Sequence, residues 1–316
     1  PLDAVGIKLT PLTKKIEETR ISYETLTVEI DRDLATATLT IFAPTQIPPE
    51  DVTGIENQGA AFWPLSMCRD LEDAVMELRV NEKEIGTWIF KTEGAAAHVE
   101  AADKLLIAHA DHWLVREIIL FMKRTFKKID VSSRSIITLV EPGSCFAGTL
   151  LELVLAADRS YMLDGSFEGS NVPAAEITLT EMNFGPLEMP NGLSRLAHRF
   201  LNDPSDIEML KAEVGQRLDA LKAEELGLVT FAPDDIDWDD EVRIAVEERA
   251  SFSPDALTGM EASLRFAGPE TMETKIFGRL SAWQNWIFQR PNAVGEDGAL
   301  KVFGSGQRAE YDKKRV

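Results

Sequence analysis

The sequence predicts an α/β fold in which short buried strands alternate with amphipathic helices. Two apolar runs, at residues 86–91 and 135–141, are each followed by a glycine-bearing turn and then by apolar residues at helical spacing. A third observation is the alternation of apolar and polar residues over 21–42, on either side of a DRD turn. This alternation predicts a β-hairpin ahead of the strand and helix units.

The other elements follow from periodicity and from glycine and proline positions. Residues 43–59 contain three prolines and are expected to form a loop. Helices are expected at 64–79 and at 112–129, the second ending in two lysines that suit the negative end of a helix. Further along we expect a strand at 159–163, a Gly/Ser/Asn-rich loop at 164–175, helices near 193–201, 205–213 and 218–226, and a last strand at 226–230.

Composition restricts the class of protein. A hydrophobic share of 44% and a charged share of 27% over 316 residues are typical of a folded globular chain. The formal net charge of -20 argues against binding to nucleic acid or to an anionic membrane surface. No apolar run has the length of a membrane span or the pattern of a signal peptide. Two cysteines form neither a disulfide framework nor a zinc site, which predicts a cytoplasmic protein.

Three regions are expected. Residues 1–20 are punctuated by proline, as a linker from an upstream half would be, and residues 21–233 hold the α/β core. Residues 234–316 are expected to be a helical extension. An apolar stripe in this extension needs a partner surface, and we expect it to act as a dimer arm; its residues are Ile276, Leu280, Trp283, Ile287 and Phe288.

The turn at 141–149 is the best candidate for a reactive site. It follows a buried strand and begins a helix, so backbone N–H groups near Gly148 and Thr149 lie at a positive helix end that attracts an oxyanion. The loop at 92–98 could supply a second donor. Glu152, one helical turn further on, and Glu176 are candidate proton carriers, although a glutamate is more often a solvated surface residue.

Histidine and cysteine are the other residue types that could supply a reactive group. The four histidines have no metal-ligand spacing, so no metal site is expected. Cys145 lies in the same turn near a helix start, where a thiol can be activated, but the sequence places no base beside it, and a buried structural cysteine is the more common case.

The segment EPGSCFAGTLLELVLAAD is similar to the crotonase signature, a glycine-rich turn that enters a helix. With the phrases DVSSRS, GTWIFKTEG, DHWLVRE, SPDALTG, GPETMET and AWQNWIF, nearly the whole chain resembles the C-terminal half of the benzoyl-CoA-dihydrodiol lyase family. The resemblance implies a crotonase-type spiral of ββα units. It also implies a lyase that converts 2,3-dihydro-2,3-dihydroxybenzoyl-CoA and water to an open-chain didehydroadipyl-CoA semialdehyde and formate in benzoate degradation. The CoA thioester is the substrate, and no cofactor is implied.

The resemblance also assigns residues. Glu152 falls six positions before Asp158, where the signature places its first catalytic glutamate, and Glu176 matches the second. The oxyanion hole would be formed by Gly148 and Thr149 together with Ala97 and His98. Two departures mark a divergent unit: the signature's three glycines are here GTL, and the oxyanion loop is EGAAAHVEAAD.

Two hypotheses therefore stand. In the first, this half is itself a lyase unit that holds the thioester. In the second, it is a catalytically silent scaffold and dimerisation unit for an N-terminal catalytic half of the same protein.

Overall fold

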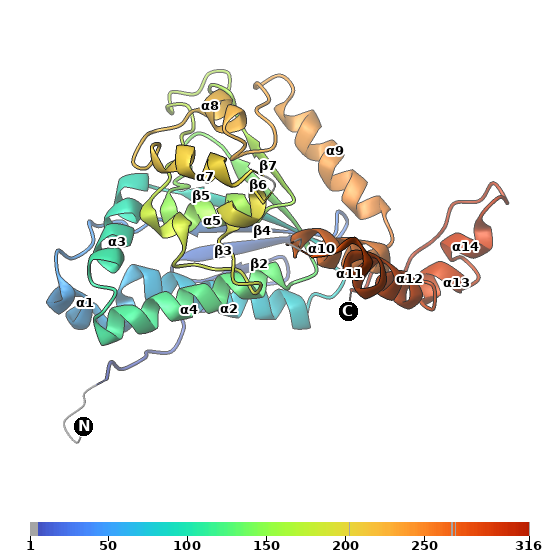
Figure 1. The fold of residues 1–316 in the computed structure, drawn as a ribbon, viewed down its shortest axis with the longest axis horizontal. Helices are drawn as coiled ribbons and strands as arrows, with labels where there is room; N and C mark the ends of the chain where they lie inside the picture. The colour runs from blue at the N-terminus through green and yellow to red at the C-terminus, as the bar shows by residue number, and fades with distance from the viewer. Residues whose placement is uncertain (1–5, 202, 267, 269, 316) are drawn as a thin grey trace.

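A computed structural model describes residues 6–201, 203–266, 268 and 270–315. Its centre is a seven-stranded sheet whose strands lie side by side in chain order (Figure 1). Strands β1 to β4 pair antiparallel, and β4 to β7 pair parallel. The strands are β1 (Lys15–Ile16), β2 (Arg20–Ser22), β3 (Leu26–Asp31), β4 (Thr36–Phe42), β5 (Thr87–Glu93), β6 (Ser135–Val140) and β7 (Arg159–Met162).

Helices fill the crossovers between the parallel strands and cover the sheet. The first group is α1 (Val52–Gln58), α2 (Trp63–Val80), α3 (Ala96–Ala108), α4 (Trp113–Asp130), α5 (Gly148–Ala156), α6 (Arg195–Arg199), α7 (Pro204–Lys211) and α8 (Ala220–Glu225). Two 3-10 turns add to it, η1 (Gly59–Ala61) and η2 (Glu181–Phe184). The predicted α/β fold and the predicted hairpin, here β3 and β4, are confirmed.

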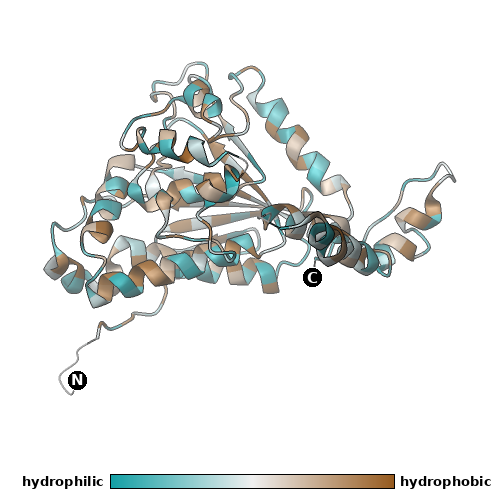
Figure 2. Ribbon diagram, in the orientation of Figure 1, coloured by the Kyte–Doolittle hydropathy of each residue, from teal (hydrophilic) through white to brown (hydrophobic). Residues whose placement is uncertain are grey.

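The central strands are buried on both faces, as parallel strands between helical layers usually are. In β5, Trp88 and Phe90 face the main core, whereas Ile89 lies between them and faces a second, smaller core. Helices α2, α4 and α5 build the main core, and α9 (Trp238–Ser251) covers the second one. Figure 2 shows the strands as predominantly hydrophobic and the helices with mixed faces.

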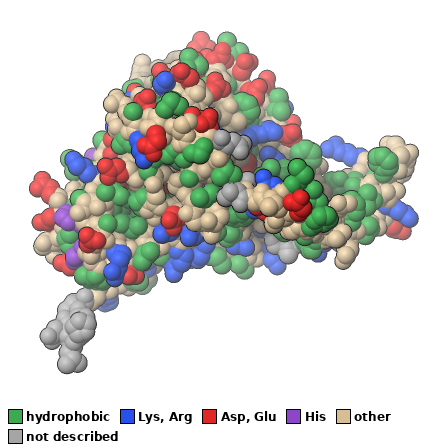
Figure 3. All heavy atoms as spheres, in the orientation of Figure 1, with side chains coloured by type: hydrophobic (Ala, Val, Ile, Leu, Met, Phe, Trp, Pro, Cys, Tyr) green, Lys and Arg blue, Asp and Glu red, His purple; other side chains and the backbone are tan. Residues whose placement is uncertain are grey.

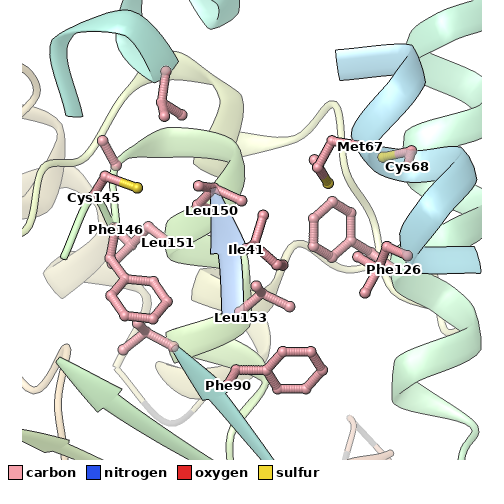
Figure 4. Packing of buried hydrophobic residues seen from close by; sticks show 14 of the residues in the cluster. Ile41, Met67, Cys68, Phe90, Phe126, Cys145, Phe146, Leu150, Leu151 and Leu153 are labelled. Atoms are coloured by element: carbon pink, nitrogen blue, oxygen red, sulfur yellow. The ribbon is translucent and has the colours of Figure 1, made fainter. Parts of the chain in front are cut away.

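Helix α5 lies in the main core (Figure 4), where its leucines pack beside β4 and β5. Leu150, Leu151 and Leu153 are fully buried near Ile41 and Phe90. Burying a leucine side chain contributes roughly 2 kcal/mol, so this packing fixes the helix and the turn that precedes it.

The predicted helical extension, residues 234–316, begins with α9. It continues with α10 (Pro254–Arg265), α11 (Met272–Thr274), a π-helical turn (Lys275–Leu280), α12 (Ser281–Ile287), α13 (Pro291–Val294) and α14 (Ala299–Val302). Helices α12 to α14 stand away from the sheet in Figure 1. The last described residues fold back, and Arg315 donates its backbone N–H to the Lys83 carbonyl oxygen.

Two local predictions were wrong. The expected loop at 43–59 contains helix α1, because the helix begins after the last proline of the run and Asp51 caps it by accepting the Gly54 N–H. The expected last strand at 226–230 is a turn, and only Phe231 forms a bridge, to Tyr161. Gly227 adopts a φ of 69°, which ends helix α8, so the chain reaches β7 only at Thr230 and Phe231, whose N–H groups donate to the Ser160 carbonyl oxygen.

The region boundaries remain predictions. Residues 1–5 of the expected linker 1–20 lie outside the described residues. The rest of that segment supplies β1 and the first residue of β2, so it takes part in the sheet.

Candidate active-site region

The predicted turn at 141–149 connects buried strand β6 to helix α5, as the sequence analysis expected. Gly148 begins the helix with a φ of 43°, in the left-handed region that favours glycine. A Cβ atom at this position would lie 1.8 Å from the Asp103 Oδ2 atom. A side chain is therefore excluded because the carboxylate of α3 approaches the backbone closely.

The backbone donors at the start of α5 are already occupied by acceptors of the protein. The Gly148 N–H donates to the Thr178 carbonyl oxygen at 3.0 Å, and the Thr149 N–H donates to Asp103 Oδ2 at 2.7 Å. The Thr149 and Thr180 hydroxyl groups donate to the same carboxylate. Asp103 thus occupies the place in which the sequence analysis expected a substrate oxyanion.

Asp103 is a functional candidate that the sequence analysis missed. Burial raises its pKa to about 7, although the hydrogen bonds from Thr149 and Thr180 oppose this shift. One signal was available in the sequence. Asp103 follows Val99 by four residues and precedes Leu106 by three, so it is an acid on the apolar face of its helix.

Glu152 lies in a buried ionic cluster. Its Oε1 accepts from the Asn183 side-chain amide and its Oε2 accepts from Arg195 Nη1, both at 2.7 Å. The other terminal nitrogen of Arg195 donates to Asp130 Oδ2, also at 2.7 Å. Each of the two acids and the arginine is at most 1% exposed.

Burial raises the pKa of Glu152 and of Asp130, and the adjacent Arg195 opposes both shifts. Glu152 is therefore held by an arginine and an amide in the interior. Its two carboxylate oxygens are directed to these partners, which is the arrangement of a structural ion pair.

Glu176 is placed differently. Its side chain is exposed, whereas Ala175 and Ile177 on either side of it are buried. Two residues further on, Thr178 forms a bridge with Ala147 beside the start of α5. The backbone near Glu176 therefore lies beside the turn. Among the described residues, however, no hydrogen bond links the Glu176 carboxylate to Glu152 or to its partners.

The second expected donor loop precedes α3. The His98 N–H donates to the Ala95 carbonyl oxygen, and His98 Nδ1 lies 2.6 Å from the Pro44 carbonyl oxygen. Ala97 is exposed. The four expected oxyanion-hole residues thus fall into two groups. Gly148 and Thr149 lie at the start of α5, next to Asp103, and Ala97 and His98 lie at the start of α3.

An open cleft of about 830 Å³ lies at the carboxyl ends of β4 and β5. His98 lines it, together with residues 42–48, Phe62 and Trp63. Among the described residues, the charged side chains that line the cleft are Glu24 and Glu93, and no lysine or arginine lines it. The cleft can therefore take an apolar group, but it offers no fixed cation for a phosphate.

Two other features concern reactive groups. Cys145 is fully buried, and burial raises the pKa of its thiol to about 11, which does not suit a thiolate nucleophile. No group of three or more His, Cys, Asp or Glu side chains in the described ranges is arranged to hold a metal ion. No described helix combines the length and the apolar character that crossing a membrane requires.

Comparison with known proteins bears out the family resemblance. The chain is 54% identical over all 316 residues to a benzoyl-CoA-dihydrodiol lyase from Aromatoleum evansii, and it spans 56% of the length of that protein. No protein-family model matches the chain.

Solved structures confirm the crotonase-type fold. An enoyl-CoA hydratase from Geobacillus kaustophilus HTA426 superposes with a TM-score of 0.65 at 17% identity, covering 96% of this chain and 100% of that one. An enoyl-CoA hydratase from Bacillus anthracis gives a TM-score of 0.62 at 15% identity, covering 92% and 100%. At these identities the likeness shows the fold alone.

Proposed function

Because the whole chain is homologous to just over half of a benzoyl-CoA-dihydrodiol lyase and has the fold of the crotonase superfamily, we propose that it serves as the scaffold unit of such a lyase. The complete enzyme would convert 2,3-dihydro-2,3-dihydroxybenzoyl-CoA with water to the open-chain semialdehyde and formate. In this proposal the chemistry takes place in the N-terminal catalytic half, and this chain supports it. The two cysteines are free and buried, which fits the expected cytoplasmic location.

The observation that carries the proposal is the occupied oxyanion position. A crotonase-type site needs free N–H groups where charge develops on the thioester oxygen. Here the Thr149 N–H binds Asp103, and the Gly148 N–H binds the Thr178 carbonyl oxygen. To use these N–H groups, an acyl-CoA would have to displace the buried Asp103 carboxylate, which accepts hydrogen bonds from three donors.

Glu176→Gln tests this proposal with little risk to folding, because the Glu176 side chain is exposed. In a lyase assembled from this chain and the remainder of the protein, the scaffold proposal expects formate release within about twofold of the unchanged enzyme. A loss of about a hundredfold or more in kcat, the size expected for removal of a general acid or base, would instead identify this segment as a lyase unit.

The cleft at the ends of β4 and β5 supports a second candidate function, in which this chain binds the acyl part of a CoA thioester itself. Calorimetry of benzoyl-CoA with this chain distinguishes the two. Ala95→Trp would fill the cleft, and Ala110→Trp is a matched control on an exposed turn outside the lining. Saturable heat that Ala95→Trp abolishes and Ala110→Trp preserves would favour binding. Absence of heat in all three proteins would favour the scaffold.

The helical extension supports the proposed dimerisation role. Figure 3 shows hydrophobic side chains gathered over the region of α11 and α12. Of the predicted stripe, Leu280 is 59% exposed, Phe288 47% and Ile276 38%, and on the same segment Met272 is 72% and Phe277 71% exposed. Neighbouring apolar side chains with this exposure are typical of a surface that another subunit covers.

We assign this face to a second copy of the chain. Phe277→Ser combined with Leu280→Ser should convert a dimer to a monomer in light scattering, whereas Ile236→Ser, which removes an exposed apolar residue far along the chain, should not. A monomeric unmodified chain would contradict the assignment.

A further inference from the structure

A second hollow, of about 290 Å³, lies at the opposite end of α5 from the candidate active-site region. It is bordered by the end of α4, the end of α5, α6, the last turns of α9, and α10. The basic side chains among its lining residues are His198, Arg199, Arg249 and Arg265. This grouping stands out on a chain with a net charge of -20.

Two of these arginines have no carboxylate partner among the described residues. Arg199 donates from Nε to the Gly227 carbonyl oxygen, and Arg249 donates from Nη1 to the Met260 sulfur at 3.7 Å. Burial lowers the pKa of Arg199, and no acidic group opposes that shift. A guanidinium group remains charged at physiological pH, so it needs an anion when it is partly removed from water.

The hollow also has unpartnered polar atoms. Asp130 Oδ1, Arg265 Nε and His198 Nε2 are buried atoms without a hydrogen-bond partner among the residues that the structure describes, and all three residues line the hollow. Asp130 is 1% exposed and Arg265 is 6% exposed. Buried polar groups are nearly always hydrogen-bonded, so these atoms indicate that a polar species fills the space.

We propose that this hollow binds a small oxyanion of the phosphate class, held by the guanidinium groups of Arg199 and Arg249. Arginine presents a planar fork of donors that matches the oxygens of such an anion. Asp130 Oδ1 can accept from a protonated oxygen of the anion. Ligand sites for larger molecules start at about 300 Å³, so the enclosed part of the ligand is a phosphate group, either free or at the end of a larger molecule.

Calorimetry with inorganic phosphate at constant ionic strength tests the proposal. The unchanged chain should show saturable binding, and Arg249→Gln should weaken it by at least about tenfold, because one charged donor is lost. Arg243→Gln is the matched control on the same helix, since Arg243 is exposed and paired with Asp240 and Glu247. This control should bind as the unchanged chain does.

Methyl phosphate in a parallel titration separates the two sources of the phosphate group. Binding of both probes, or of methyl phosphate alone, supports a phosphate presented by a larger ligand, and binding of inorganic phosphate alone supports the free ion. The proposal is overturned if neither probe binds, if Arg249→Gln binds as tightly as the unchanged chain, or if Arg243→Gln loses as much affinity. The measurement reads affinity directly, so it does not depend on the scaffold proposal.

Discussion

Replacing Asp103 by asparagine should remove part of the pH dependence of the stability of this chain. The substitution keeps the size of the side chain and leaves an amide oxygen to accept the Thr149 N–H. It removes the titration of a buried acid. The predicted effect is therefore a change in how stability varies with pH, with limited change in structure.

The direction follows from the raised pKa. The Asp103 carboxyl has a pKa of about 7 in the folded chain and 3.8 as a reference for the unfolded chain. Between these values the folded state binds more protons than the unfolded state, so the contribution of Asp103 is complete below pH 3.8 and is lost as the pH rises through 7. At about 1.4 kcal/mol per pH unit, the loss amounts to about 4 kcal/mol at most.

Urea unfolding followed by tryptophan fluorescence at several pH values measures this effect. The free energy of unfolding of Asp103→Asn minus that of the unchanged chain should increase by up to about 4 kcal/mol between pH 4 and pH 8, because every other titrating group is common to both proteins. A difference that is constant with pH would refute the raised pKa. A difference that decreases with pH would mean that the three donors stabilise an ionised Asp103, which would reverse the argument.

Two further predictions concern the same region. Arg195→Met should lower the free energy of unfolding by about 3 to 5 kcal/mol at pH 8, because it leaves the buried Asp130 and Glu152 without their cation; the loss, measured in urea, should shrink toward pH 5 as these acids take up protons. Gly148→Ala should cost more than about 2 kcal/mol, since the new methyl group would meet the Asp103 carboxylate at 1.8 Å and the φ of 43° disfavours a side chain; thermal unfolding measures it.

Matched control variants separate the loss of these buried contacts from the effect of removing a charge or adding a methyl group elsewhere. Lys211→Met removes an exposed ion pair with Glu208 and should change stability by less than about 0.5 kcal/mol. Gly165→Ala also has a positive φ, of 97°, but meets no atom within 4 Å, so it should cost only the backbone strain, about 1 kcal/mol. Equal losses in each test variant and its control would contradict the assigned roles of Arg195 and Asp103.

Local sequence patterns predicted the architecture well. The hairpin, strands β5 and β6, and helices α2, α4 and α5 follow from periodicity, because an apolar spacing of two or of about 3.6 residues fixes which face of a segment is buried. The errors arose where short-range signals compete. Asp51 starts a helix directly after a proline-rich run, and Gly227 turns the chain after α8, so that it meets the sheet edge only from Thr230 onward.

The turn from β6 into α5 was also determined by the sequence, since Gly148 and the apolar helix after it specify a positive helix end in the core. Only the tertiary structure decided what occupies that end. Asp103 comes from a helix 46 positions away in the chain, and the Arg195 that holds Glu152 is 43 positions away. Such pairings depend on how helices pack, which no local period specifies. Here they place Thr149 of the signature in a hydrogen bond to Asp103, and Glu152 of the signature in an ion pair with Arg195.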